Sequence, residues 1–318
     1  MKPLATWTWR AVRLAIGVGI AAWIIRQVDM EALSRDTGNW RRNWPLWMLA
    51  AEALYLAVYG LGIARWRLLM RSQAITIPFH RAFTLFFIGH FFNAFMLGAA
   101  GGDLVKAWAV ARETHHRKTE AATLVFLDRL LGLAALVLLV LAVLAIRAPM
   151  LKGSGPIRTS AVFLGALMGG MALAVFALFR RNWLQSRAWR AHSVWPWLPP
   201  ALPAQVERVY AAADRLRHRP DLLGRAFAFS LGIHLLSLLA NYLFAVAIAS
   251  GLSPMQALTL YPLVGALGAL PLTPGGLGVR EGAAVLLALL PYLGITLWSL
   301  FGGLLYLLEP WRAPRPAS

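Results

Sequence analysis

The sequence predicts an all-α polytopic membrane protein, and its composition and its long apolar runs are the observations that predict it. Of the 318 residues, 59% are hydrophobic and 14% are charged, and the mean hydropathy is +0.62. A soluble domain is about half apolar and about a quarter charged, so this chain has too little polar surface to cover a soluble globule. We expect about six to eight transmembrane helices in a single integral membrane domain, residues 1–318.

The formal net charge of +18 is the other unusual property of so apolar a chain. The basic residues are scattered between apolar runs, which argues against nucleic-acid binding and favours contact with anionic inner-leaflet lipids. The chain has no cysteine, which excludes disulfides and thiolate chemistry. His115 and His116 lack carboxylates at ligand spacing, so we expect no metal site and no cofactor.

Apolar runs that approach the length needed to cross a bilayer can be read directly from the sequence. In order they are Ala11–Ile25, Pro45–Ala64, Ala82–Ala100, Ala121–Ile146, Ser160–Phe179, Ala226–Ser250, and a stretch interrupted by Gly and Pro, Met255–Leu308. The first run has the basic start of a signal peptide, but no small-residue cleavage site follows it. We therefore interpret it as a retained first span.

The distribution of basic residues predicts the topology. Cytoplasmic connections carry an excess of Lys and Arg, and residues 180–225 carry nine of these residues. That segment lies on the cytoplasmic side, together with the N-terminus, when Ala82–Ala100 enters the membrane and returns. We therefore expect a re-entrant third segment, whose backbone must be buried in protein or line a wet cavity. We also expect residues 180–225 to form a basic interfacial segment with a helix over Gln205–His218.

A first broken-helix motif ends the re-entrant run and reads Gly98-Ala99-Ala100-Gly101-Gly102-Asp103-Leu104-Val105-Lys106. Paired glycines let the backbone turn sharply and expose amide groups, and Asp103 is placed as the N-cap of the next helix. A helix N-terminus beside Lys106 suits a phosphate group. The alternative is a simple glycine turn before a capped helix.

A second motif breaks the last apolar stretch and reads Leu272-Thr273-Pro274-Gly275-Gly276-Leu277-Gly278-Val279-Arg280-Glu281-Gly282. Arg280 and Glu281 fall at or beside membrane depth, where charges are expensive and face a partner, a cavity or a pathway. Paired broken helices in the two halves of a chain point to a transporter's binding site, and the likeness of the two motifs suggests an inverted repeat. The alternative is a short surface loop with Arg280 reaching the interface.

Asp128 and Arg129 lie about two turns into the Ala121–Ile146 run. Adjacent helix residues point in different directions, so each is expected to meet a group on another segment. For Arg129 we expect a phosphate or Glu281, and for Asp128 we expect Arg280 or Lys106. An internal structural salt bridge is the alternative. The other polar side chains at membrane depth are expected to be hydrogen-bonded packing residues; they are Glu52, His90, Asn93, His234 and Asn241.

Three segments resemble the transmembrane region of lysylphosphatidylglycerol synthases, a flippase-like membrane family. They read GGDLVKAWAVARET, AATLVFLDRLLGLAALVLL and PLTPGGLGVREGAAVLLAL, and the resemblance covers about residues 45–310. Two departures are Lys106, where members often carry arginine, and Leu97-Gly98-Ala99-Ala100, where members have proline. The resemblance implies a site formed by Gly101, Gly102, Asp103, Lys106, Asp128, Arg129, Pro274, Gly275, Gly276, Gly278, Arg280 and Glu281. The synthases also carry a cytosolic aminoacyltransferase domain that this chain lacks, so we do not expect lipid aminoacylation.

These features together predict a transporter that moves an anionic membrane phospholipid or a polyprenyl-phosphate-linked lipid between leaflets. Lys106, Arg129 and Arg280 would neutralise the phosphate, and the neighbouring carboxylates would orient these cations. No ATP-binding motif is present, so movement would follow a gradient or be coupled to an ion. Arginine far outnumbers lysine, which is typical of a GC-rich bacterial genome, and we expect the bacterial cytoplasmic (inner) membrane. The alternatives are a membrane-embedded enzyme or accessory subunit of envelope lipid or glycan synthesis, and a membrane scaffold.

Overall fold

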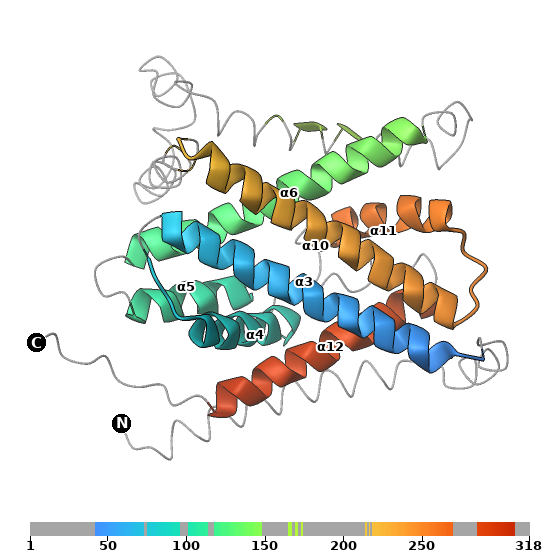
Figure 1. Cartoon of the computed structure of the whole chain (residues 1–318), viewed down its shortest axis with the longest axis horizontal. Helices are drawn as coiled ribbons and strands as arrows, with labels where there is room; N and C mark the ends of the chain where they lie inside the picture. The colour runs from blue at the N-terminus through green and yellow to red at the C-terminus, as the bar shows by residue number, and fades with distance from the viewer. Residues whose placement is uncertain are drawn as a thin grey trace, which may run out of the picture. The chain divides into compact units, whose positions relative to one another are not determined.

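In a computed structural model of the chain, the described residues are 42–72, 75–95, 101–113, 118–147, 218–269 and 285–308, with a few single positions in 165–173 and 214–216. Most of these residues are helical, and none of them lies in a strand (Figure 1). The helices are α3 (Trp44–Ser72), α4 (Phe79–Phe95), α5 (Gly101–Glu113), α6 (Lys118–Ile146), α10 (Pro220–Ala247), α11 (Pro254–Ala269) and α12 (Val285–Leu308). The predicted fold class, an all-α polytopic membrane protein, is confirmed.

Within this part of the chain, three helices are long and apolar enough to cross a membrane. They are α3, α10 and the Thr123–Ile146 part of α6, with mean hydropathies of 1.6, 1.7 and 2.8. A shorter apolar helix covers Leu293–Leu308 within α12. The runs predicted at Pro45–Ala64, Ala121–Ile146 and Ala226–Ser250 lie on α3, α6 and α10. The apolar pattern therefore located these spans to within a few residues at most ends.

Helix α3 is longer than its apolar run, because it continues past Ala64 to Ser72. This extension brings Arg65, Arg67 and Arg71 onto the helix. At the other end, the Asn43 carbonyl accepts a hydrogen bond from the Leu46 N–H. Pro45 is tolerated there because the first turn of a helix has no internal partner for its N–H groups. Arg65, which directly follows the apolar run and was expected to lie in the connection after it, is therefore part of a membrane helix.

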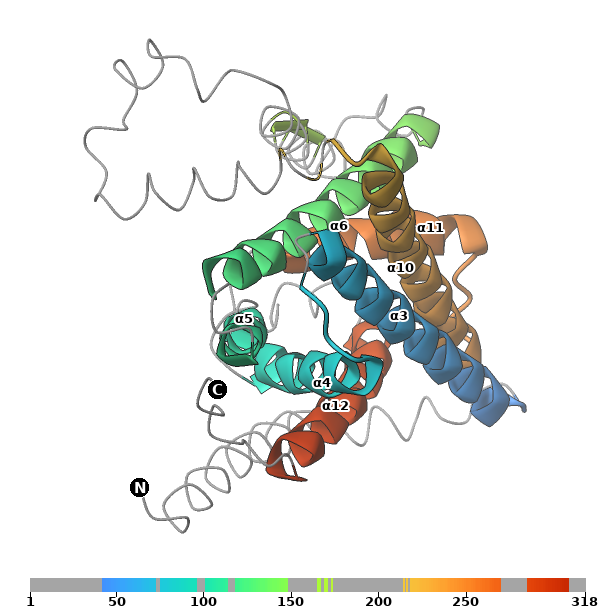
Figure 2. The same ribbon diagram turned by 60° about the vertical axis from the view of Figure 1, so that its left-hand side comes forward.

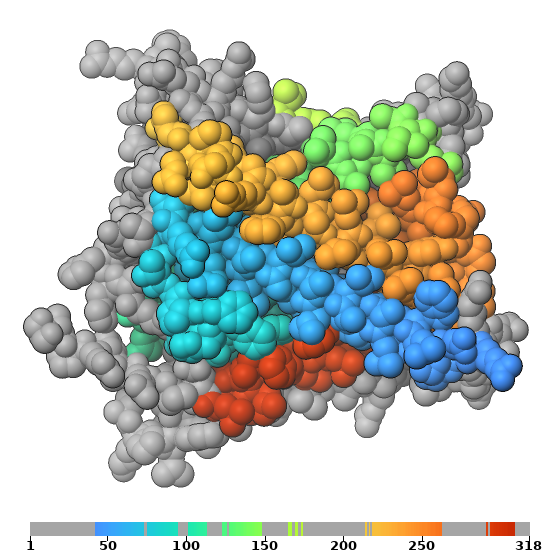
Figure 3. All heavy atoms as spheres, in the orientation of Figure 1, coloured from blue at the N-terminus to red at the C-terminus, as the bar shows by residue number. Residues whose placement is uncertain are grey.

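Large apolar side chains remain exposed along the long helices. On α3 these include Leu46, Leu49 and Leu56, which are 64%, 66% and 47% exposed. On α12, Leu297 and Leu308 are similarly exposed. Side chains of α3 and α12 are open to view in Figure 3, in blue and red. Exposed apolar surface of this extent is typical of helices that face lipid.

The chain forms two compact units. Unit 1 contains residues 1–58, 77–113 and 236–318, and unit 2 contains residues 59–76 and 114–235. In unit 1, α4 packs against both α5 and α12, as Figures 1 and 2 show. Aromatic side chains fill the contact of α4 with α12. The Phe87 ring meets that of Phe301 edge-on at 5.2 Å, and the Phe92 ring meets that of Tyr306 at the same distance.

The structure changes one detail of the first motif. Asp103 was predicted to be an N-cap, but α5 begins at Gly101 and places Asp103 in its first turn. A carboxylate in the first turn still meets the positive end of the helix dipole. The predicted re-entrant run Ala82–Ala100 is helical in α4 up to Phe95, and residues 96–100 lie outside the described residues.

Several predictions fall wholly or mostly outside the described residues. They concern the first span at Ala11–Ile25, the helix at Gln205–His218, almost all of Ser160–Phe179 and most of the basic segment 180–225. The second motif, within residues 270–284, is also outside. The single domain, the inverted repeat and the topology stay predictions.

Candidate charged site within the membrane helices

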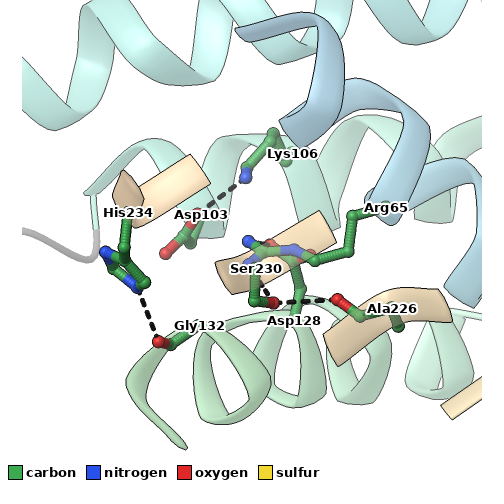
Figure 4. A network of polar contacts seen from close by, with 8 residues as sticks. All are labelled: Arg65, Asp103, Lys106, Asp128, Gly132, Ala226, Ser230 and His234. Atoms are coloured by element: carbon green, nitrogen blue, oxygen red, sulfur yellow. Dashed lines mark hydrogen bonds and ion pairs between the residues drawn. The ribbon is translucent and has the colours of Figure 1, made fainter. Parts of the chain in front are cut away.

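A buried ion pair lies at the start of α5, in unit 1. The Lys106 Nζ is 2.9 Å from the Asp103 Oδ1, one helical turn away. Lys106 is 5% exposed and Asp103 is 8% exposed. The Lys106 ammonium also lies 5.4 Å from the centre of the Phe86 ring on α4. The two charged residues of the first motif are therefore paired with each other (Figure 4) and are both buried.

The double glycine of this motif lets α4 and α5 approach closely. A Cβ on Gly102 would clash with the Gly89 carbonyl oxygen, and a Cβ on Gly89 would lie 2.6 Å from the Lys106 Cγ. The Gly102 N–H donates to the Asn93 Oδ1 at 2.8 Å. Asn93 therefore caps α5 from the preceding helix and occupies one of the amides that the glycines of this motif were expected to expose. Close packing explains Gly102 in this structure.

A second buried ion pair, in unit 2, joins α3 to α6. The Arg65 Nε lies 2.7 Å from the Asp128 Oδ1, and the Arg65 Nη2 lies 3.0 Å from the Asp128 Oδ2. Two parallel N–H···O bonds of this kind are the strongest geometry available to a guanidinium and a carboxylate. The Arg65 and Asp128 side chains are 11% and 6% exposed. Both residues lie on helices that qualify as membrane spans.

Helix α10 completes the polar cluster of unit 2. The Arg65 Nη1 donates to the Ser230 Oγ at 2.8 Å, and Ser230 in turn donates to the Ala226 carbonyl. The His234 Nε2 lies 2.9 Å from the Gly132 carbonyl oxygen, one turn after Asp128. A Cβ on Gly132 would lie 3.2 Å from the Arg65 Nη1. Small residues on α6 and α10 thus make room for the guanidinium (Figure 4).

Comparison with known proteins places this chain in a family of membrane proteins. Residues 10–307 match the family model described as the lysylphosphatidylglycerol synthase TM region. The chain belongs to this family. It is also similar to a "UPF0104 membrane protein" of Methanothermobacter thermautotrophicus, with 23% identity over 276 residues that cover 80% of this chain and 78% of the relative. The resemblance seen in the sequence motifs is therefore confirmed.

In the structure, the partner of Asp128 differs from the partners that the sequence predicted. Arg280 or Lys106 was predicted, but Asp128 pairs with Arg65, and the partner shown for Lys106 is Asp103. Arg129 is exposed next to buried Asp128, as its different direction on α6 requires. Arg65 was absent from the predicted site because it follows the apolar run and was counted with the connection. The signal available in the sequence was that Arg65 directly follows the apolar run Pro45–Ala64.

The remaining predicted site residues belong to the second motif. Pro274, Gly275, Gly276, Gly278, Arg280 and Glu281 lie outside the described residues. Helices α11 and α12 flank the motif on either side. Of the side chains expected to be hydrogen-bonded within the bundle, Asn93, His234 and Asn241 all have such partners, and the Asn241 amide oxygen accepts from Tyr55 at 2.8 Å. Among the described residues, no group of three His, Cys, Asp or Glu side chains is placed to hold a metal ion.

Proposed function

We propose that this protein moves a lipid with a phosphate-bearing anionic headgroup between the leaflets of the bacterial cytoplasmic membrane. The observation that carries the proposal is the buried, bidentate Arg65–Asp128 pair on two membrane helices. Transfer of two charged groups from water into the protein interior costs roughly several kcal/mol for each ion. The attraction between the two charges does not reliably offset this cost. Ionisable residues within membrane helices are therefore rare and mark binding sites and pathways.

Each cluster has a feature that suits an anion. In unit 2, Asp128 is paired with Arg65, and the adjacent residue on α6, Arg129, is exposed. A phosphate arriving beside Arg129 would meet an exposed guanidinium group. In unit 1, Lys106 and Asp103 compensate each other beside the N-terminus of α5, whose dipole favours anions. We propose Lys106 and Arg129 as phosphate-binding cations, with Asp103 and Asp128 holding the cations in place.

The second motif contributes to the proposal through its sequence. Arg280 would supply a further phosphate-binding cation, and Glu281 would orient it. The loop Pro274-Gly275-Gly276, followed by Gly278, would bring backbone N–H groups to the headgroup. The acyl chains would remain in the lipid beside the exposed leucines of α3 and α12. Such a polar path for the headgroup lowers the barrier to crossing without any covalent step.

A translocation assay with purified protein in lipid vesicles tests this function. Fluorescent phosphatidylglycerol, phosphatidylethanolamine and a polyprenyl phosphate are placed in one leaflet, and their arrival in the other is followed by a membrane-impermeant quencher. We expect the anionic lipids to move faster than they do in protein-free vesicles. In the vesicles that contain the protein, we expect the zwitterionic lipid to move more slowly than the anionic lipids. Equal rates with and without protein for all three lipids would refute transport. Recovery of a chemically altered lipid would favour an enzyme instead.

A further inference from the structure

Glu52 is a carboxylate on a membrane helix whose partner is an indole rather than a cation. It lies on α3, about 12 Å from the start of the helix at 1.5 Å per residue. The Trp298 Nε1–H on α12 donates to the Glu52 Oε2 at 2.8 Å. Both residues belong to unit 1. Among the described residues, Glu52 forms no ion pair.

The surroundings of this pair are apolar on the side of α12. The Trp298 ring lies 6.0 Å from the Phe87 ring and 6.3 Å from the Phe301 ring, measured between centres. A Cβ on Gly294 would clash with the Glu52 Oε1. The backbone of α12 therefore packs directly against one carboxyl oxygen while the indole holds the other.

Among the ionisable side chains that the structure describes near this position, none forms an ion pair with Glu52. Helix α12 has no Asp, Glu, Lys, Arg or His, and its titratable side chains are Tyr292 and Tyr306. On α3 the neighbouring titratable residues are Tyr55 and Tyr59, and Tyr55 donates to Asn241 on α10. Helix α4, which packs on α12, carries His80, Arg81 and His90. Within the described residues, none of these groups is bonded to Glu52.

An unpaired carboxylate in apolar surroundings is costly, and protonation removes the charge. We propose that Glu52 is a proton-binding site, with the proton on Oε1 and with Oε2 accepting from the Trp298 N–H. A metal cation fits less well, because it would need several oxygen ligands and the indole presents the positive end of an N–H bond. If lipid transport as proposed above holds, gain and loss of this proton would couple it to a proton gradient.

Infrared difference spectroscopy of the full chain in lipid vesicles tests the proton site without depending on transport. We expect a protonated-carboxyl C=O band at neutral pH that is missing in Glu52→Gln and retained in the control Asp221→Asn, whose carboxylate is exposed near Arg219. A spectrum without this band, or one that Glu52→Gln leaves unchanged, would overturn the proposal. If Glu52→Gln does not fold, Trp298→Phe serves instead. It removes the donor and is expected to shift the band to higher frequency, and an unshifted band would overturn the assignment.

A second arm measures lipid movement with a pH difference imposed across the vesicle membrane. We expect the wild-type rate to respond to the pH difference and the Glu52→Gln rate not to respond. An equal response in both proteins would overturn the coupling role. A wild-type protein that moves no lipid while its Glu52 band is present would contradict the proposed transport and support the proton site. The two proposals therefore fail in distinguishable ways.

Discussion

Arg65 on α3 and Asp128 on α6 form a bidentate ion pair, with N–O distances of 2.7 and 3.0 Å, inside the helical part of unit 2. The pair is held from a third helix by Ser230, which accepts from the remaining guanidinium nitrogen. Three helices that are distant in sequence are thus fixed to one another by one guanidinium group.

Removal of one partner from this pair should destabilise the protein strongly. Asp128→Ala leaves the Arg65 charge buried without its carboxylate, which is expected to lower the free energy of unfolding by about 3–5 kcal/mol. The double variant Arg65→Met with Asp128→Leu should recover most of that loss. Denaturant unfolding in detergent micelles measures both effects. Arg219→Ala, which removes an exposed pair with Asp221, should change little. A single variant as stable as the wild type would contradict the structural role of the pair.

Gly102→Ala should be far more damaging than an alanine elsewhere in a helix. The added Cβ would clash with the Gly89 carbonyl, so α4 and α5 would have to move apart. The matched control is Gly60→Ala on α3, where a Cβ meets nothing within 4 Å and where helix propensity favours alanine by about 1 kcal/mol. Thermal unfolding in detergent should show a lower midpoint for the first variant and an unchanged or higher one for the second. Similar midpoints for the two variants would mean that the helices do not pack as described.

Loss of the Asn93 cap should loosen the start of α5. Asn93→Ala deprives the Gly102 N–H of its acceptor, at a cost of about 1 kcal/mol. Hydrogen exchange followed by mass spectrometry should show faster exchange in the first turn of α5, while α10 exchanges as in the wild type. Asn93→Asp keeps an acceptor oxygen and should restore slow exchange. Exchange in Asn93→Ala that matches the wild type would show that the cap is unimportant.

The sequence predicted the spans well and their partners poorly, for a physical reason. Whether a segment is apolar and long enough to cross the bilayer depends on its own sequence alone. The predicted run Ala121–Ile146, for example, ends at the same residue as α6. The choice of Arg65 over Arg280 or Lys106 as the partner of Asp128 depends on which helix faces pack together. The sequence of a single segment does not contain the information on which helix faces pack together. Arg65 also sits at the edge of an apolar run, where a charged residue reads equally well as the start of a connection.

The role of the double glycine could be predicted only in part. Paired glycines indicate an unusual backbone, and the sequence placed the start of the next helix just after Asp103, three residues from Gly101, where α5 begins. Whether glycine serves to expose amides or to admit a neighbouring helix depends on what lies opposite. In this structure Gly89 and Asn93 of α4 lie opposite Gly102, and neither belongs to the motif.

The most direct test of the link between these charges and lipid movement is the translocation rate of an anionic lipid in vesicles containing Lys106→Gln or Arg129→Gln. A charged hydrogen bond contributes about 1.5–3 kcal/mol, so we expect each variant to move the lipid about tenfold more slowly or worse. Arg112→Gln, on the same helix as Lys106 but stacked on Trp108, should keep the wild-type rate. Wild-type rates in both Lys106→Gln and Arg129→Gln would contradict a phosphate-binding role for these cations.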